Sequence, residues 1–262
     1  MTIPMNVGRI IYTNTEPFFA KWPYHLFPVM SGFPRQLAQA ARDGEIVAGA
    51  LPIVECWNLE REFDPLGSFG IAAKGACQSV LLLSKRPMSD LRRVTVGLTR
   101  ESSTSVMLLD VLMKYRYQQI DITYKRGLQP NDDAWLMIGD QALRVWDKGG
   151  LPQWPYVTDL AVEWWKWQQL PFVFALWVCL RRIEFQMKER LHQTLASSLE
   201  AGLASLPEIA ARQWPTLLIP SEKIVRYLQG FTYMLGEEEM ESARIFRQLA
   251  HGRVSELASS PV

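Results

Sequence analysis

Apolar and polar positions alternate in blocks along the chain, and these blocks predict strands interleaved with helices. Residues 7–12 form a short apolar run that stops before Asn14, which is typical of a strand followed by a turn. Residues 34–43 repeat apolar positions at helical spacing, and residues 46–53 form a second apolar run after a glycine. The opening of the chain therefore predicts strand, helix, strand, an order typical of an α/β fold.

The same alternation continues to the end of the chain. Hydroxyl residues 102–105 precede an apolar helical run, as a capped helix start requires. Residues 172–178 are apolar without interruption, which indicates a central strand covered on both faces. Strands are predicted at 79–84, 95–98, 120–124, 134–138 and 172–178, with helices at 106–115, from 141, and at 182–203, 221–227 and 237–249.

Composition fits a folded protein without an electrostatic preference for polyanions. The chain is 48% hydrophobic and 21% charged, a composition too apolar for general disorder. Its 262 residues are enough for one or two lobes. The 28 Lys and Arg residues nearly cancel the 27 Asp and Glu residues. We therefore expect no nucleic-acid partner.

Targeting signals and reactive thiols are also not expected. The first 19 residues lack a basic start followed by an apolar stretch, and the most apolar segment, 170–180, is much shorter than the ~20 residues of a membrane span. Cys56, Cys77 and Cys179 are few, odd in number and embedded in apolar segments. We predict structural thiols, a cytoplasmic protein and no membrane insertion.

The run from Glu101 to Ser105 is the clearest candidate for ligand chemistry. It lies between a predicted strand and a predicted helix, where free backbone N–H groups and hydroxyls bind a carboxylate or phosphate. A single Ser or Thr could instead only cap the helix. Four consecutive hydroxyl residues exceed that need, so both interpretations stay open.

Two other polar residues have undecided roles. Asn14 could bind a ligand through its amide, but Asn is also a common turn residue. Ser79 begins a buried strand, and sequence does not tell whether it faces a ligand or the core.

Motifs for metal-dependent or nucleotide chemistry do not occur. His25, His192 and His251 lack metal-ligand spacing, and the pair Asp132–Asp133 is typical of a solvated turn. The sequence also contains no GxSxG, P-loop or GxGxxG motif. We predict no metal site and no cofactor.

Several segments, in this order, resemble the chorismate dehydratase family of the futalosine route to menaquinone. The family's opening motif is close to Tyr-Leu-Asn followed by Pro, and here Tyr12-Thr13-Asn14 is followed by Pro17, so the Asn is kept and Leu is replaced by Thr. The resemblance covers nearly the whole chain. Its segments are GRIIYTNTEPFF, GEIVAGALPIVE, FGIAAKGACQSVLLLSK, VGLTRESSTSVMLLDVLM, DAWLMIGDQAL, LPFVFALWV and YLQGFTYMLGEEEMESARIF.

The resemblance implies a periplasmic-binding-protein-like (type II) α/β clamshell with a ligand cleft between two lobes. We expect residues 1–87 and 176–262 to form lobe 1 and residues 88–175 to form lobe 2. It further implies a hydro-lyase that converts chorismate to 3-[(1-carboxyvinyl)oxy]benzoate and water, as a monomer or homodimer. In this reading Asn14 is catalytic, and the substrate-binding residues are Ser79, Ser103, Thr104, Ser105, Gly139 and Asp140.

Two other functions compete with this one. The same clamshell could bind a small carboxylate metabolite without chemistry, as the recognition part of a transporter or sensor does. The sister naphthoate synthase of the same pathway resembles this fold but is expected to carry a catalytic His at the cleft. None of the three histidines lies in a matching context.

Overall fold

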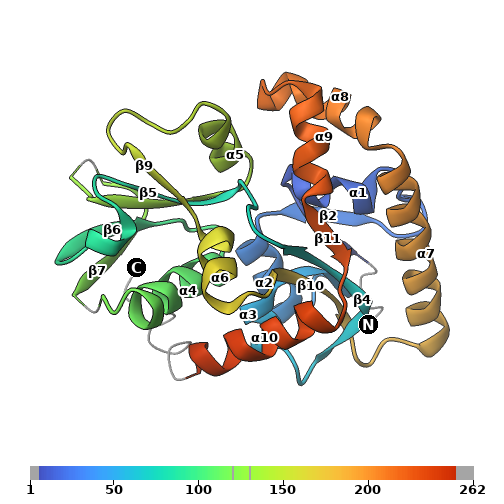
Figure 1. Ribbon diagram of the computed structural model, residues 1–262. Helices are drawn as coiled ribbons and strands as arrows, with labels where there is room; N and C mark the ends of the chain where they lie inside the picture. Colours follow the sequence, from blue (N-terminus) through green and yellow to red (C-terminus); the bar gives the residue numbers. More distant parts are fainter. Residues whose placement is uncertain (1–5, 120, 130, 252–262) are drawn as a thin grey trace. The chain divides into compact units, whose positions relative to one another are not determined.

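The predicted apolar runs form strands of two separate sheets in the computed structural model, which describes residues 6–119, 121–129 and 131–251 (Figure 1). Contacts within the chain divide it into two units. Unit 1 contains the described residues up to Ala72 together with Phe174–Gly236. Unit 2 contains Ala73–Val173 and the described residues from Glu237 onward. Neither unit is one continuous stretch of chain.

Unit 1 is built on a six-stranded sheet in the order β11-β4-β10-β3-β1-β2. Strand β1 runs parallel to β2 and β3, whereas β10 returns antiparallel to β3, with Trp177 opposite Ala50. The strands are β1 (Val7–Ile10), β2 (Val29–Gly32), β3 (Ala48–Pro52), β4 (Phe63–Ala73), β10 (Phe172–Leu180) and β11 (Phe231–Met234).

Helices of unit 1 fall into two groups by what they contact. Helix α2 packs on the parallel strands, and its apolar positions Leu37, Ala38 and Ala41 are buried. Helix α1 packs on α7 and α8, and α8 packs on α9 (Figure 1). The helices are the 3₁₀ turn Thr13–Thr15, α1 (Glu16–Phe19), α2 (Pro34–Arg42), α3 (Ile53–Asn58), α7 (Phe185–Ala204), α8 (Leu206–Leu217) and α9 (Ser221–Gln229).

The short helix α1 is fixed by close contact with α7. A Cβ atom on Gly202 of α7 would lie 1.9 Å from the carbonyl oxygen of Pro17, so only glycine allows this approach. One turn earlier on α7, the Ser198 hydroxyl donates to the carbonyl oxygen of Phe18 at 2.7 Å. On its other side, Phe18 contacts Trp177 with ring centroids 5.3 Å apart. Helix α1 is therefore held between α7 and the aromatic core.

Unit 2 is built on a five-stranded sheet in the order β7-β6-β8-β5-β9. Strand β6 is parallel to β7 and β8, whereas β5 is antiparallel to both β8 and β9. The strands are β5 (Val80–Ser84), β6 (Val94–Leu98), β7 (Ile122–Arg126), β8 (Ala134–Ile138) and β9 (Tyr156–Asp159).

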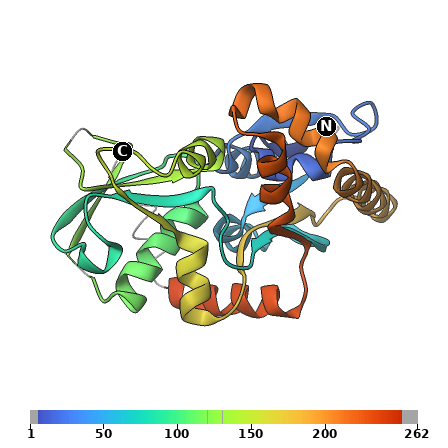
Figure 2. The same cartoon turned by 45° about the horizontal axis from the view of Figure 1, so that its top comes forward.

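Helices cover both faces of this second sheet (Figures 1 and 2). Helix α5 covers one face, where Leu81, Leu83 and Met137 pack with Val145. Helices α4 and α6 lie on the other face, and α10 packs against α4. Their bounds are α4 (Ser103–Val111), continued by the π-helical turn Leu112–Arg116, α5 (Gly139–Asp147), α6 (Leu160–Gln168) and α10 (Glu237–Ala250); a 3₁₀ turn spans Met88–Asp90.

Several connections between strands and helices lie at one edge of this sheet. Strands β6 and β8 end there, and the helices that follow them begin there. Because β5 is antiparallel to β8, its first residue lies at the same edge. In parallel α/β units this edge is where ligands collect, since each following helix points its free N–H groups toward it.

The predicted strands and helices lie where the structure has them, but some of their first or last residues differ. Strand β8 has the predicted bounds 134–138, and β10 extends the predicted 172–178 by two residues. Residue 120, at the start of the predicted strand 120–124, lies outside the described residues. Helix α4 starts three residues before the predicted 106, because Ser102 rather than Ser105 caps it.

The division into units differs from the expected lobe boundaries. Residues 73–87 were expected in lobe 1 but belong to unit 2, because β5 is a central strand of its sheet. Helix α10 was also expected in lobe 1, but it packs on α4, and Ser242 accepts a hydrogen bond from the Trp164 indole at 2.9 Å. Residues 252–262, also placed in lobe 1, lie outside the described residues.

Among residues 6–119, 121–129 and 131–251, no helix combines the length and apolar character that crossing a membrane requires.

The contact at Gly202 predicts a large effect of a small substitution. Gly202→Ala should lower the free energy of unfolding by about 1–3 kcal/mol or more, because the added methyl group overlaps the backbone of Pro17. Glu200→Ala, on an exposed face of the same helix, should change it by less than about 0.5 kcal/mol. Urea unfolding of both variants measures the difference. Equal stability of the two variants would show that α1 does not depend on this approach.

Candidate functional site

Asn14 lies in a tight turn at the carboxyl end of β1. The turn is a 3₁₀ helix, Thr13–Thr15, followed directly by α1. The Thr15 hydroxyl lies 2.7 Å from the carbonyl oxygen of Ile10 and 2.9 Å from that of Tyr12, so it connects the turn to the end of β1. Both threonines that flank Asn14 are fully buried. The backbone of Asn14 is therefore fixed by its neighbours, which leaves the amide side chain available for another role.

An ion pair braces this turn from the strand side. The guanidinium of Arg9 on β1 bonds the carboxylate of Glu16 at the start of α1, and it also donates to the Tyr24 hydroxyl at 3.3 Å. Its charge lies over the Phe19 ring, 5.3 Å from the centroid. Strand, turn and helix are thus connected on both sides of Asn14.

The side-chain carbonyl of Asn14 is left unsatisfied by the protein. Its Oδ1 atom is shielded from solvent and has no hydrogen-bond partner within the described part of the chain. A buried amide oxygen without a partner carries a desolvation cost of about 1–3 kcal/mol. An unpartnered amide oxygen in a rigid turn is typical of a site that accepts a hydrogen bond from a ligand.

In unit 2, a serine cluster forms the first turn of α4. The Ser102 hydroxyl accepts from the backbone N–H of Ser105 at 3.2 Å and lies 3.2 Å from the Ser105 hydroxyl, so Ser102 is the N-cap. The Ser103 hydroxyl is shielded and has no partner among the described residues. The cluster therefore separates into a capping part and a part that is free to bind.

The three predicted residues of this cluster do not have equal access. Thr104 and Ser105 are 1% and 3% exposed, whereas Ser103 is partly exposed. Backbone N–H groups of a first helical turn lack intrahelical acceptors, so Ser103 can still offer its N–H group to an anion.

Ser79, Gly139 and Asp140 meet at the same sheet edge. The Gly139 N–H donates to the Ser79 carbonyl at 2.8 Å, and Gly139 has a φ of +67°, which glycine adopts without strain. The Ser79 hydroxyl donates to the carbonyl of Cys77 at 3.1 Å. Asp140 occupies the first turn of α5, where a carboxylate balances the positive end of the helix. Structure therefore brings these three residues together, but gives the Ser79 hydroxyl an internal acceptor.

Asp159 joins this edge without having been identified from the sequence. It ends β9 and caps α6, where its Oδ1 atom accepts from the N–H groups of Ala161 at 2.9 Å and Val162 at 3.3 Å. Burial raises the pKa of this carboxylate, although its hydrogen bonds act in the opposite direction. An Asp directly before an apolar helical run is an N-cap signal that sequence analysis could have used.

Cys56 and Cys77 are buried thiols, and His192 packs on an aromatic ring. Burial raises the pKa of Cys56 to about 12 and holds that of Cys77 well above its usual value, so neither forms a thiolate near neutral pH. His192 packs on the Phe69 ring with centroids 5.3 Å apart. Among the described residues, no group of three or more His, Cys, Asp or Glu side chains is arranged to hold a metal ion.

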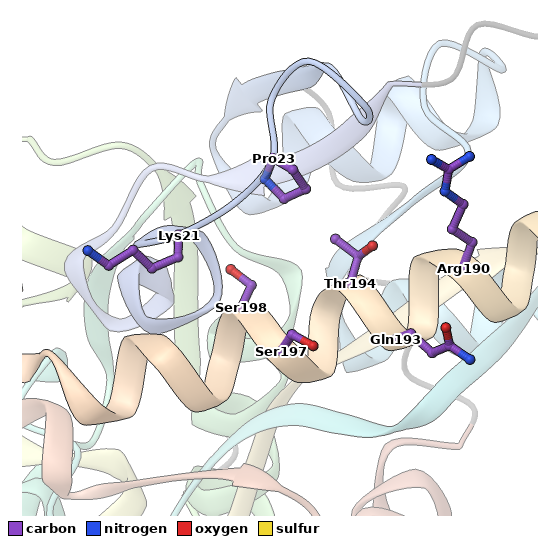
Figure 3. Close-up of a pocket in the computed structure, with 7 residues that line it drawn as sticks. All are labelled: Lys21, Pro23, Arg190, Gln193, Thr194, Ser197 and Ser198. Atoms are coloured by element: carbon purple, nitrogen blue, oxygen red, sulfur yellow. The ribbon is translucent and has the colours of Figure 1, made fainter.

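A separate open pocket of about 400 Å³ lies on unit 1 between α7 and the loop after α1 (Figure 3). Lys21 and Arg190 stand at its two ends, with the hydroxyls of α7 between them. The Lys21 ammonium lies 3.8 Å from the Glu208 carboxylate, which offsets its charge. None of the residues predicted for the site lines this pocket. Its lining residues are Lys21, Pro23, Arg190, Gln193, Thr194, Ser197 and Ser198.

Solved structures with the same fold are binding proteins as well as proteins without a stated ligand. A protein of Archaeoglobus fulgidus matches with a TM-score of 0.75 at 14% identity, covering 96% of this chain and 98% of its own. The periplasmic aliphatic sulphonate binding protein SsuA of Escherichia coli matches with a TM-score of 0.64 at 16% identity, covering 98% and 89%. At such low identity the likeness shows the fold, which is periplasmic-binding-protein-like as predicted.

Sequence comparison is more specific. A chorismate dehydratase of Thermus thermophilus is 29% identical over 267 aligned residues, which cover 94% of each protein. The model of a family described as menaquinone biosynthesis matches residues 5–252, a span that includes every residue of the candidate site. The chain therefore belongs to this menaquinone biosynthesis family.

Proposed function

We propose that the protein is a chorismate dehydratase, a hydro-lyase that forms 3-[(1-carboxyvinyl)oxy]benzoate and water. The observation that carries the proposal is the buried, unpartnered Oδ1 of Asn14 in the rigid turn after β1. The family membership and the similarity to the Thermus thermophilus enzyme along 94% of both chains support the same reaction. The futalosine route is the setting that the resemblance of the sequence implies.

Substrate chemistry matches the groups that the two units offer. Chorismate is a dianion with a ring carboxylate, an enolpyruvyl carboxylate and a hydroxyl at C4. In our proposal the hydroxyl and the backbone N–H group of Ser103, at the start of α4, bind a carboxylate. Asn14 bonds the C4 hydroxyl or the group that receives the proton.

The reaction balances without an external oxidant or reductant. The C3–H bond breaks and its electron pair forms a ring double bond, while the C4–O bond breaks and the hydroxyl leaves. The proton from C3 and the departing hydroxide together make water. Because the ring becomes aromatic, product formation is strongly favoured, and the protein has mainly to orient and polarise the substrate.

An amide is too weak a base to remove the ring proton alone. We propose that a substrate carboxylate, held in place by α4, accepts the proton, and that Asn14 assists. The Asn14 oxygen can accept a hydrogen bond from the C4 hydroxyl, and its NH₂ group can donate to the developing charge. Ser79, Thr104, Ser105, Gly139 and Asp140 complete the substrate site in this proposal.

Cellular location and assembly are proposed on less specific grounds. The cysteines Cys56, Cys77 and Cys179 are free thiols in the structure, which suits a reducing compartment such as the cytoplasm. We propose that the protein acts there as a monomer or homodimer, without added metal or organic cofactor.

The first prediction concerns turnover of chorismate. The purified protein should convert chorismate to a product lighter by one water with a benzoate spectrum, followed by liquid chromatography and mass spectrometry. Asn14→Ala should lower kcat by about 10²- to 10⁴-fold with an unchanged circular dichroism spectrum, because it removes a polarising group whose Oδ1 atom forms no hydrogen bond within the described residues. Asn58→Ala, at an exposed position of unit 1, is the matched control.

Each other outcome leads to a different function. Chorismate that is bound, as calorimetry detects, but returned unchanged would make the protein a carboxylate-binding module. If the protein neither binds nor converts chorismate, its likeness to chorismate dehydratase would extend to the fold alone. Full activity of Asn14→Ala would remove Asn14 from the mechanism.

A second prediction separates the two serines at the start of α4. Ser102→Ala should lower the free energy of unfolding by about 1 kcal/mol, because it removes the helix cap. Ser103→Ala should change stability by less than about 0.5 kcal/mol, yet raise KM roughly tenfold or more, since a hydrogen bond to a carboxylate is lost. Urea unfolding and steady-state kinetics on both variants test this contrast. An unchanged KM for Ser103→Ala would mean that α4 binds no carboxylate through this hydroxyl.

A further inference from the structure

The segment that enters β5 adopts a costly backbone conformation immediately before Ser79. Gln78 has a φ of +59°, in the left-handed region that non-glycine residues rarely occupy. The next residue, Ser79, presents its carbonyl to the Gly139 N–H at the start of α5. The conformation of Gln78 therefore sets the direction from which Ser79 approaches the proposed substrate site.

A single buried carboxylate holds this conformation. The Oδ2 atom of Asp159 accepts from the Gln78 N–H at 2.6 Å, and its Oδ1 atom accepts from the Cys77 thiol at 3.3 Å. With the two N–H groups of α6, the carboxylate accepts from four donors on two chain segments. It thus links the segment before β5 to the start of α6.

Burying a carboxylate here has a larger desolvation cost than capping a helix requires. Asp159 is 4% exposed and forms no ion pair with a described Lys, Arg or His, so its charge is stabilised by neutral donors alone. A serine would cap α6 without burying a charge. Only a longer side chain with two acceptor atoms reaches both α6 and Gln78. Strain and a buried charge occurring together beside a ligand site point to a functional use of both.

We propose that Asp159 is a positioning residue of the substrate site: it holds Gln78 in the left-handed conformation, which keeps Ser79 and Gly139 in the geometry that binds the substrate. This inference rests on the proposed function, because Ser79 and Gly139 are substrate-binding residues only in that proposal. Asp159 itself does not contact the substrate.

Two substitutions at Asp159 separate positioning from capping. Asp159→Ser keeps an acceptor for the N–H groups of α6 but is too short to reach Gln78. We expect a folded protein in which KM for chorismate rises at least tenfold, whereas kcat falls less than threefold. Asp159→Asn should behave similarly, because its NH₂ group either faces the Gln78 N–H or displaces the cap. Thr158→Ala, one residue earlier on β9, is the matched control and should keep the wild-type KM.

A rescue experiment tests the mechanism of the effect. Glycine adopts positive φ without strain, so Gln78→Gly combined with Asp159→Ser should restore KM to within about threefold of the wild-type value. A merely structural role for Asp159 would not be rescued by relaxing one residue of another segment. An unchanged KM in Asp159→Ser, or no recovery in the double variant, would overturn the inference.

Failure of the proposed function gives a different pattern. If the wild-type protein neither binds nor converts chorismate, the function is wrong, and hydrogen exchange of the Gln78 and Gly139 amides still tests Asp159. Both amides should exchange at least tenfold faster in Asp159→Ser than in Thr158→Ala. Equal exchange rates would overturn the positioning role whatever the substrate.

Discussion

The pairing of β10 with β3 is the contact on which unit 1 depends. Strand β3 follows the first 47 residues of the chain, whereas β10 arrives only after the whole of β5 to α6 has been traversed, and it then lies at the centre of the sheet. Its Trp177 supports Phe18, and Phe18 belongs to the short helix that follows Asn14. The turn that presents the Asn14 amide is therefore fixed by residues more than 150 positions away.

The turn at Asn14 in unit 1 and the start of α4 in unit 2 are built in the same way. In each unit a strand ends at the carboxyl edge of a sheet, and the following turn is immobilised by its own backbone contacts. Thr15 closes the turn at Asn14, and Ser102 caps the helix that begins at Ser103. The Asn14 Oδ1 atom in unit 1 and the Ser103 hydroxyl in unit 2 are among the shielded polar atoms that have no hydrogen-bond partner within the described residues. Because local hydrogen bonds make each turn rigid, these atoms are held in place before a ligand binds, and the site is preorganised.

Sequence patterns predicted those parts of the fold that depend on local periodicity. Strand β8 was predicted with its full extent, because five apolar residues lie between polar turns. Strand β4 was missed, because Pro65, Gly67 and Gly70 interrupt its pattern, and its pairing depends on partners distant in sequence. In the serine cluster, the residue types indicated anion binding, but only the structure shows that Ser102 caps the helix and that Thr104 and Ser105 are buried. The sequence carries an N-cap signal at Asp159, but no local pattern could predict its contact with the Gln78 N–H, which is made 81 residues away.

The division of the chain has a consequence for how the protein can be made and divided. The backbone passes from one unit to the other at residues 72–73, 173–174 and 236–237. Helix α4, which carries the unpartnered serine, is covered by α10, so unit 2 is finished only after every strand of unit 1 has been synthesised. Neither unit can then be expressed as one uninterrupted fragment, and a cut after Gly236 would leave α10 attached to unit 2 only through its packing contacts. Nascent chains on the ribosome must accordingly hold two incomplete sheets at once.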